Sequence, residues 1–402
     1  MSKYKKYSID TICVKDDEVT QSGQSHVLPI HASSSFSYKT IDDSIEIFQK
    51  KKPGYVYSRY GNPTVSSVEN KLAAMEGIGL ADPVGCLMTS SGLSAISTFA
   101  LALLSKADEV ITQKDLYGGT TELFKKVISK LDVKIHEVDL NDLDQLEQIL
   151  KSNPKVKLIY METPSNPTLN CLDITAIAKL AKNYETYSAI DNTFCTCYIQ
   201  KPFVLGVDFV LYSTTKFLNG HGNSIAGAIL CKDQDFKELL WDTMKLVGTN
   251  CNAWDAWLLH NGLKTLAVRM DKHCSNARSI AQFLENHDRV KKVNYPGLES
   301  HSTHKQAVKQ MSQFGGMISF EIDGNLEAGK SFMDNTQLCT IAATLGNVDT
   351  LLLHPATSSH LNIPKATRES CGITDGLIRI SVGIENVEDL IADIDQALQT
   401  IS

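Results

Sequence analysis

The sequence predicts an α/β protein with a mostly parallel central sheet, helices on both faces of that sheet, and a smaller C-terminal α/β domain. Between residues 61 and 256, short β-rich apolar runs alternate with helical periods, and this alternation is typical of a parallel sheet. A second group of strand-like and helical segments follows from 257 to 402. The chain of 402 residues is long enough for two such domains.

Residues 1–60 are predicted to form an irregular N-terminal arm. They are polar, contain few periodic segments and include the turn-rich run KKKPGYVYSRYGNP at 50–63. Because an arm of this kind often crosses onto a neighbouring subunit, we expect it to contact a second copy of the chain.

The expected strands of the central sheet are short and apolar. A helical period of Leu143, Leu146, Ile149 and Leu150 separates two of them. Ligands of such sheets bind outside the C-terminal ends of the strands, so the residues that follow each strand are the candidates for a site. The runs lie at 109–112, 133–139, 156–162, 187–191, 208–213 and 227–231.

The predicted C-terminal domain, residues 257–402, has strand-like runs at 315–323 and 377–383. It ends on a helix with one apolar stripe, which is the side expected to face a core. The stripe consists of Val387, Leu390, Ile391, Ile394, Ala397 and Leu398.

Composition and charge exclude several classes of function. The net charge of −7 leaves no basic surface for nucleic acid or anionic lipid. No segment reaches the apolar length of a membrane span, and the start MSKYKKYSID lacks the apolar core of a secretion signal. We therefore expect a cytoplasmic protein.

The cysteines are expected to be reduced thiols rather than disulfides or metal ligands. The chain has ten, and none forms a CxxC pair. Cys195 and Cys197 form a CxC pair, but no further ligands cluster with them. No metal site is predicted.

The segment from Met88 to Leu104 places small polar residues directly before a strongly apolar helix. Unpaired N–H groups and a partial positive charge at a helix N-terminus favour anions. Ser91, Gly92 and Leu93 are therefore candidates to hold a phosphate. Serine is also a common helix cap, and capping alone explains Ser91 equally well.

A lysine with two flanking hydroxyl residues follows the expected strand 208–213. Ser213 and Thr215 can donate to a phosphate, and Lys216 can attack an aldehyde when nearby cationic or desolvating groups keep its amine neutral. A solvated surface lysine is the alternative for any single lysine. The position at a strand end and the hydroxyls favour a cofactor lysine.

Asp191 ends the expected strand 187–191. A carboxylate there can pair with a protonated pyridine nitrogen and keep the ring an electron sink. An Asp-Asn pair is also a common turn or helix cap. Asp191 and Lys216 follow neighbouring strands in sequence, so both can lie at one edge of the sheet.

Taken together, these residues resemble the Cys/Met-metabolism family of pyridoxal-phosphate (PLP) enzymes, which includes cystathionine γ-synthase, cystathionine γ-lyase and methionine γ-lyase. The matching segments occur in order and cover nearly the whole chain. They are YSRYGNPT (57–64), SSGLSAI (90–96), LYGGT (116–120), ETPSNPT (162–168), DNTF (191–194), STTKFLNGHG (213–222), GLKTLAVRM (262–270) and RISVGIE (379–385).

The resemblance implies a fold-type I PLP enzyme in which Lys216 carries the cofactor as a Schiff base and moves protons between substrate carbons. It implies that Asp191 holds the pyridine nitrogen protonated and that Tyr117 stacks on the ring and acts as an acid or base. It also implies that Asn166 lies near the ring oxygen. The phosphate would be held by Ser91, Gly92, Leu93, Ser213 and Thr215.

The same resemblance implies how substrate and subunits meet. Arg379 would bind the substrate α-carboxylate through a bidentate pair, with Thr344 beside it. Tyr57 and Arg59 would reach the phosphate of the neighbouring subunit, and Tyr57 the substrate as well. A homodimer would then be the minimum active unit, and related enzymes are usually tetramers of two such dimers.

The choice of substrate rests on a few departures from the family patterns. Glu122 stands where cystathionine-using members carry an arginine, and Ala343 stands where they tend to carry a glutamate. A carboxylate at 122 would repel a second substrate carboxylate. FCTCYIQKP (194–202) and HPA (354–356) resemble methionine γ-lyase, although Gly119 replaces the cysteine of typical members and Asn223 replaces an aspartate.

We therefore predict a C–S lyase that carries out γ-elimination on a sulfur amino acid, with methionine the first candidate. Its products would be 2-oxobutanoate, ammonia and a thiol. Cystathionine γ-lyase or γ-synthase and O-acetylhomoserine sulfhydrylase are the alternatives. A non-catalytic regulator that kept the PLP fold is a remote one, which the intact Lys216, Asp191, Tyr117 and Arg379 disfavour.

Overall fold

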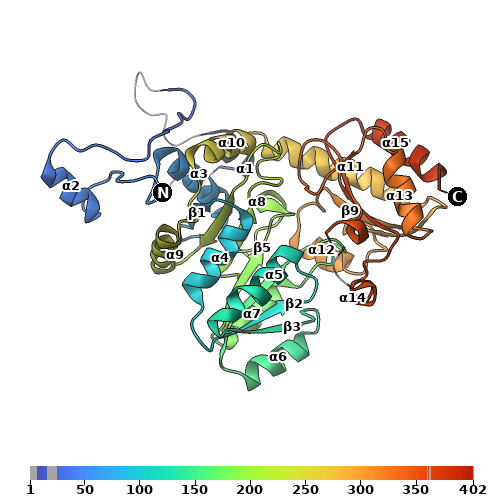
Figure 1. Cartoon of the computed structure of the whole chain (residues 1–402), viewed down its shortest axis with the longest axis horizontal. Helices are drawn as coiled ribbons and strands as arrows, with labels where there is room; N and C mark the ends of the chain where they lie inside the picture. Colours follow the sequence, from blue (N-terminus) through green and yellow to red (C-terminus); the bar gives the residue numbers. More distant parts are fainter. Residues whose placement is uncertain (1–6, 16–24, 360, 362–363, 402) are drawn as a thin grey trace.

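The structure is a computed structural model that describes residues 7–15, 25–359, 361 and 364–401. Two α/β units lie side by side, and helix α11 (Leu266–Glu285) runs from one to the other (Figure 1). Its first half packs in the N-terminal core through Met270, and its second half packs in the C-terminal core through Ile280. One helix therefore belongs to both cores.

The central sheet has seven strands within the described residues, in the order β1-β7-β6-β5-β4-β2-β3. The neighbours from β6 through β3 are parallel, whereas β7 is antiparallel to both β1 and β6. The predicted mostly parallel sheet is confirmed. The strands are β1 (Gly85–Thr89), β2 (Glu109–Gln113), β3 (Lys134–Val138), β4 (Val156–Glu162), β5 (Tyr187–Asp191), β6 (Phe209–Ser213) and β7 (Gly227–Cys231).

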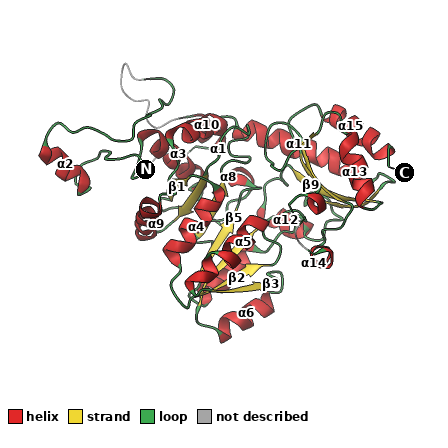
Figure 2. Ribbon diagram, viewed as in Figure 1, coloured by secondary structure: helices red, strands yellow, loops and turns green. Residues whose placement is uncertain are grey.

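Helices cover both faces of this sheet, as predicted (Figure 2). The apolar residues of α3, α6, α7 and α10 form one core with the sheet, and those of α4, α5 and α9 form another. The helices are α3 (Pro63–Glu76), α4 (Gly92–Leu103), α5 (Gly118–Lys126), the 3₁₀ turn η1 (Ile128–Leu131), α6 (Leu143–Ser152), α7 (Ile174–Asn183), α8 (Thr196–Ile199), α9 (Gln234–Val247) and α10 (Ala253–Leu263).

The C-terminal unit is a five-stranded sheet, in the order β10-β11-β12-β9-β8 within the described residues, with helices packed on it. In Figure 1 it is the orange and red unit on the right, next to α11. Its elements are β8 (Val290–Asn294), α12 (His304–Gln310), β9 (Met317–Ile322), α13 (Leu326–Asn335), β10 (Thr340–Ile341), β11 (Leu351–Leu353), the 3₁₀ turn η2 (Pro355–Thr357), α14 (Lys365–Ser370), β12 (Leu377–Ser381) and α15 (Val387–Gln399).

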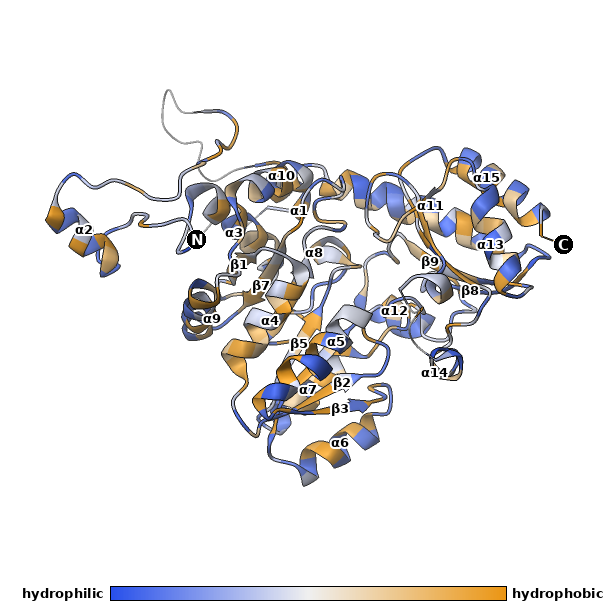
Figure 3. Ribbon diagram, viewed as in Figure 1, coloured by the Kyte–Doolittle hydropathy of each residue, from blue (hydrophilic) through white to orange (hydrophobic). Residues whose placement is uncertain are grey.

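Hydropathy explains which side of each element faces inward. Apolar residues concentrate in the central strands (Figure 3). In the outer helix α6, Leu146 and Leu150 are buried in the N-terminal core. In α15, Leu390, Ile394 and Leu398 of the predicted stripe are fully buried. The helical periods at 143–150 and 387–398 are therefore confirmed.

The arm departs from the irregular segment that we expected. Its described part contains α1 (Ile9–Val14) and α2 (Ile41–Phe48). Ile12 and Cys13 of α1 are buried in the N-terminal core, whereas α2 buries no residue and Ile41 is 78% exposed. Both helices are shorter than the windows in which periodicity is measurable. Residues 1–6 and 16–24 of the predicted arm lie outside the described residues.

Four strands were not predicted: β1, β8, β10 and β11. β1 is buried along its whole length and shows no alternation, and β8 is an edge strand with two central lysines. β10 and β11 span only two and three residues. Within the described residues, no helix is both long and apolar enough to cross a membrane.

Candidate active site

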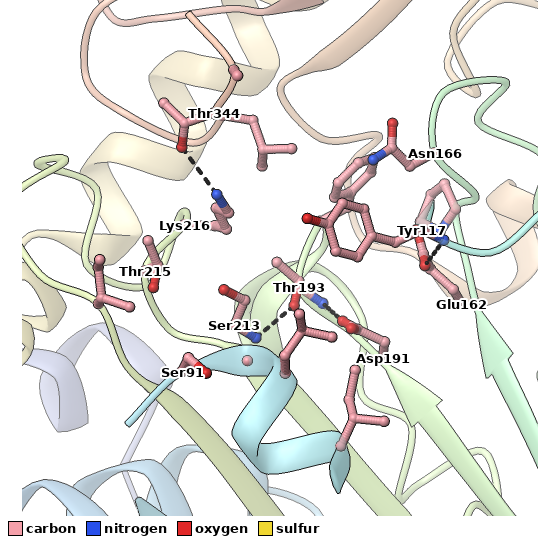
Figure 4. Close-up of a pocket in the computed structure, with 18 of the residues that line it drawn as sticks. Ser91, Tyr117, Glu162, Asn166, Asp191, Thr193, Ser213, Thr215, Lys216 and Thr344 are labelled. Atoms are coloured by element: carbon pink, nitrogen blue, oxygen red, sulfur yellow. Dashed lines mark hydrogen bonds between the residues drawn. The ribbon is translucent and has the colours of Figure 1, made fainter. Parts of the chain in front are cut away.

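A cavity of about 320 Å³ lies at the C-terminal ends of the central strands, between the two units. Most of the residues singled out in the sequence line it (Figure 4). They are Ser91, Gly92, Leu93, Tyr117, Asn166, Asp191, Ser213, Thr215, Lys216, Thr344 and Arg379.

Lys216 lies in the turn that follows β6. Its Nζ donates a hydrogen bond to Thr344 Oγ1 at 3.0 Å (Figure 4). Burial lowers the pKa of Lys216 to about 8, and the positive charge of Arg379 adds to the shift. An appreciable fraction of this amine is therefore neutral near neutral pH, which is the form that attacks a carbonyl.

Asp191 is the last residue of β5, as predicted. Its Oδ1 accepts the backbone N–H of Thr193 at 3.0 Å, and the Thr193 hydroxyl accepts the backbone N–H of Ser213 at 2.8 Å. Burial raises the pKa of the Asp191 carboxyl. A cationic partner in the cavity would offset this cost of burying a charge.

The N-terminus of α4 lines the cavity on the side away from Thr344 (Figure 4). Ser91 caps the helix, because its hydroxyl accepts the N–H of Ser94 at 3.0 Å and the Ser94 hydroxyl accepts the N–H of Ser91 at 2.7 Å. The capping alternative for Ser91 is therefore realised. The first N–H groups of the helix remain directed outward from its end, as in any helix.

Gly92 allows α4 to approach the end of β6. A Cβ at position 92 would lie 2.7 Å from Ser213 Cβ, closer than side chains pack. The hydroxyl of Thr215 is bound to Ala226, donating to its carbonyl at 3.2 Å and accepting its N–H at 3.1 Å. Ser213 and the α4 N-terminus therefore face the cavity together.

Tyr117 is the N-cap residue of α5, and its ring points into the cavity between Asp191 and Lys216 (Figure 4). It is 47% exposed. A Cβ at position 119 would come within 2.6 Å of Tyr117 Cε1. Gly119 therefore leaves the ring room in this position, and a cysteine there would require the ring to shift.

Arg379, in β12, reaches the cavity from the C-terminal unit. Its Nη1 donates to Asn166 Oδ1 at 3.3 Å and its Nη2 donates to the carbonyl of Thr344 at 2.9 Å. Its Nε is buried and has no partner in the described part of the chain. Burial lowers the pKa of Arg379 to about 10, so the guanidinium stays charged near neutral pH.

Tyr57 and Arg59 do not line this cavity. Tyr57 is 43% exposed, and Arg59 donates to the carbonyl of Lys245 and stacks on the rings of Tyr57 and Tyr60. Their predicted contact with a neighbouring subunit stays a prediction.

The residues expected to select the substrate differ in position. Ala343 lines the cavity, whereas Glu122 is 64% exposed on α5 and pairs with Lys126. Asn223 is outside the cavity and accepts a hydrogen bond from Asn219 at 2.9 Å. Any repulsion between Glu122 and a second substrate carboxylate acts through solvent, where it is screened. Glu122 therefore disfavours a substrate with two carboxylates less strongly than the sequence indicated.

Some cavity residues were not predicted to act there. Glu162 ends β4 next to Asp191, and Thr193 links the ends of β5 and β6. The rule that placed Asp191 at a strand end applies equally to Glu162. The remaining wall is apolar and consists of Ile96, Pro164, Phe194, Ile225 and Leu345.

Within the part of the chain that the structure describes, no group of three or more His, Cys, Asp or Glu side chains could hold a metal ion. All ten cysteines are free thiols, and Cys195 and Cys197 are buried. Burial raises the pKa of both thiols well above their usual value, so neither is an activated nucleophile.

The donor set fits pyridoxal phosphate. The α4 N-terminus and Ser213 would hold the phosphate, since Ser91, Gly92 and Ser213 line the cavity together. Lys216 would meet the aldehyde and Asp191 the pyridine nitrogen. The unpartnered Nε of Arg379 would remain for a substrate carboxylate.

Comparison with known proteins gives the same result. The family model described as Cys/Met metabolism PLP-dependent enzyme matches residues 10–399. An L-methionine gamma-lyase of Fusobacterium nucleatum subsp. polymorphum is 40% identical over 99% of both chains. A cystathionine beta-lyase of Lactococcus lactis subsp. cremoris (strain MG1363) is 42% identical over 92% of this chain and 93% of the relative.

The fold comparison agrees. The crystal structure of cystathionine gamma-lyase from Lactobacillus plantarum complexed with L-serine is 36% identical, with a TM-score of 0.90 over 98% of this chain and 99% of that one. The fold-type I prediction and the PLP prediction are therefore confirmed. The chain belongs to the Cys/Met metabolism PLP-dependent enzyme family.

Proposed function

We propose that the protein is a PLP-dependent carbon–sulfur lyase that carries out γ-elimination on methionine. Methionine and water would give methanethiol, ammonia and 2-oxobutanoate. The observation that carries the proposal is the charge of the cavity wall. Among the described residues that line it, Lys216 and Arg379 are the only cations, so a substrate with one carboxylate fits better than one with two.

The apolar wall supports the same substrate. With Arg379 holding the α-carboxylate, a substrate side chain would lie among Ile225, Ala343 and Leu345. A thioether suits these residues, since burying apolar surface is favourable and leaves no polar group unpaired.

The residues divide the chemistry as follows. Bound PLP supplies an electron sink for the charge that develops at the substrate Cα. Asp191 would pair with the charged pyridine nitrogen, and Arg379 would orient the substrate through its carboxylate. The amine of Lys216 would remove the Cα proton and move protons to and from neighbouring carbons. Tyr117 would hold the ring and exchange a proton with the leaving sulfur.

Assembly and location are part of this proposal. Tyr57 and Arg59 lie outside the cavity of their own chain, which supports a homodimer, and by family resemblance a tetramer, in which they serve the partner. An amino-acid substrate and free, mostly buried thiols are consistent with a cytoplasmic enzyme.

Product analysis with purified protein tests the proposal. We expect methanethiol and 2-oxobutanoate from methionine, and slower turnover of cystathionine. The second candidate is a cystathionine lyase, which the 42% identity to the Lactococcus lactis relative favours. Release of a thiol from cystathionine with no product from methionine would overturn our proposal, and a requirement for O-acetylhomoserine plus sulfide would indicate a sulfhydrylase.

A further inference from the structure

Glu162 is a buried carboxyl in the cavity wall to which the mechanism above gives no role. It ends β4, exposes 6% of its surface and lies beside Asp191 (Figure 4). A buried carboxyl is costly unless its hydrogen bonds are made, so its partners indicate what it does.

The first partner is the backbone of Tyr117. The Tyr117 N–H donates to Glu162 Oε2 at 2.9 Å, drawn as a dashed line in Figure 4. Tyr117 stands at the N-cap of α5, but its side chain makes no capping hydrogen bond. The turn that carries the ring into the cavity is therefore held by Glu162.

Asn166, in the loop that follows β4, serves the other wall of the cavity, because its Oδ1 accepts Arg379 Nη1 at 3.3 Å. The contact that Glu162 makes through its carboxyl is the one with the Tyr117 turn.

Glu162 is itself held in place by Gln113 at the end of β2. The Gln113 amide accepts the N–H of Glu162 at 2.8 Å and donates to its carbonyl at 2.9 Å. Gln113 is 2% exposed. The backbone of Glu162 is therefore fixed on both sides, and its side chain can act as a rigid support.

A negative charge on Glu162 would be repelled by the carboxylate of Asp191. Glu162 and Asp191 are directly paired in the register of β4 and β5. Burial and the negative charge of Asp191 raise the pKa of Glu162 well above its usual value, and Asp115 adds to the effect. Tyr160 of β4 faces the same pair and contributes no cation. A neutral acceptor at 162 avoids this repulsion.

We propose that Glu162 is a positioning residue that acts as a hydrogen-bond acceptor and holds the turn that carries Tyr117 into the cavity. This inference rests on the proposed PLP-dependent function. A hydrogen-bond acceptor at position 162 does not need a negative charge, so glutamine can replace Glu162 and alanine cannot.

The test compares Glu162→Ala, Glu162→Gln and a control, Glu109→Ala, in the full chain. Glu109 is a half-buried carboxylate at the opposite end of β2 and hydrogen-bonds to His136 and Asn153. Two quantities are measured: the Kd of the cofactor-free protein for pyridoxal 5′-phosphate, followed by visible absorption, and kcat and KM for methionine.

We expect E162A to weaken cofactor binding and kcat/KM about tenfold or more, because the backbone N–H of Tyr117 loses its acceptor. E162Q restores both to within about threefold of the parent, and E109A leaves both unchanged while lowering thermal stability. E162A behaving like E109A would overturn the proposal, as would E162Q being as defective as E162A. If E162A does not fold, E162Q alone tests the proposal. Cofactor affinity and kcat/KM within about threefold of the parent protein would support it, and a loss of about tenfold or more would overturn it.

The Kd measurement separates this inference from the choice of substrate. If the parent protein does not act on methionine, the proposed substrate fails, but cofactor binding by E162Q and E162A still ranks the two variants. If the parent binds no pyridoxal phosphate, the proposed function and this inference fail together.

Discussion

The two walls of the cavity are built in different ways. The cofactor wall consists of Lys216 and of Glu162, Asp191 and Ser213, which are the last residues of three adjacent strands of one sheet. The substrate wall comes from the C-terminal unit, with Thr344 in a loop and Arg379 within β12. Their contacts with Lys216 and Asn166 join residues 128 and 213 positions apart.

This difference teaches which part of the site is easiest to change. Parallel strands bring their C-terminal ends to one edge whatever their sequence, so the cofactor wall depends on a few residues at fixed places. The substrate wall depends on how two units pack. We expect changes in the first wall to lower kcat or cofactor affinity and changes in the second to alter substrate affinity.

The largest expected effect is that of Lys216→Ala. Without the amine, kcat should fall about 10³-fold or more, and the visible absorption of the lysine-bound cofactor should disappear. Steady-state kinetics and absorption spectra measure both, with Lys179→Ala, an exposed lysine on α7, as control. Retention of both activity and the visible band would contradict the role of Lys216.

Asp191→Asn comes next and tests the other end of the cofactor wall. Asparagine keeps the size but cannot pair with a charged ring nitrogen, so we expect kcat to fall about 10²-fold, with KM changing little. The control is Asp144→Asn, an exposed position on α6. A variant whose defect lies entirely in KM would place Asp191 in substrate binding instead.

Arg379→Lys tests the substrate wall. A lysine keeps the charge but loses the planar pair of donors, so KM for methionine should rise about 10- to 50-fold. The Kd for pyridoxal phosphate should stay within about threefold. Arg278→Lys, at an exposed position on α11, is the matched control. If cofactor affinity fell as much as substrate affinity, the two walls would not be separate.

The smallest expected effect is a shift in the pH dependence of cofactor capture by Lys216, which depends on the charge of Arg379 in the other wall. Burial and the charge of Arg379 lower the pKa of Lys216 to about 8. Capture of pyridoxal phosphate by the cofactor-free protein should therefore speed up as pH rises through about 8 and the amine loses its proton. Arg379→Met removes a repelling charge, so the same profile should move to higher pH. Stopped-flow absorption measures it, and a profile that is unmoved or moves lower would show that Arg379 does not act on Lys216.

The sequence predicted the cofactor wall more completely than the substrate wall. Asp191 and Lys216 could be placed because strand ends and their turns are local features. Glu162 follows the same rule, but its partner Tyr117 precedes α5 and is 45 positions away in the chain, and no local pattern indicates that they meet. Glu122 shows the opposite failure, since its place in the sequence suggested the site while its side chain faces solvent.

The arm shows the limit of periodicity. α1 and α2 span six and eight residues, too short for a 3.6-residue period to be distinguished from chance. Only tertiary packing shows that Ile12 and Cys13 enter the core while Ile41 stays exposed.

By itself, the sequence determined the mostly parallel sheet, the edge at which ligands bind and the residues that mark a PLP enzyme, because alternation and strand ends are written in short segments. Tertiary structure alone decided that Arg379 meets Asn166 and Thr344, that Glu162 supports Tyr117, and that Glu122 lies outside the cavity. These depend on the packing of two units and on side-chain direction, which are set by contacts between residues far apart in the chain.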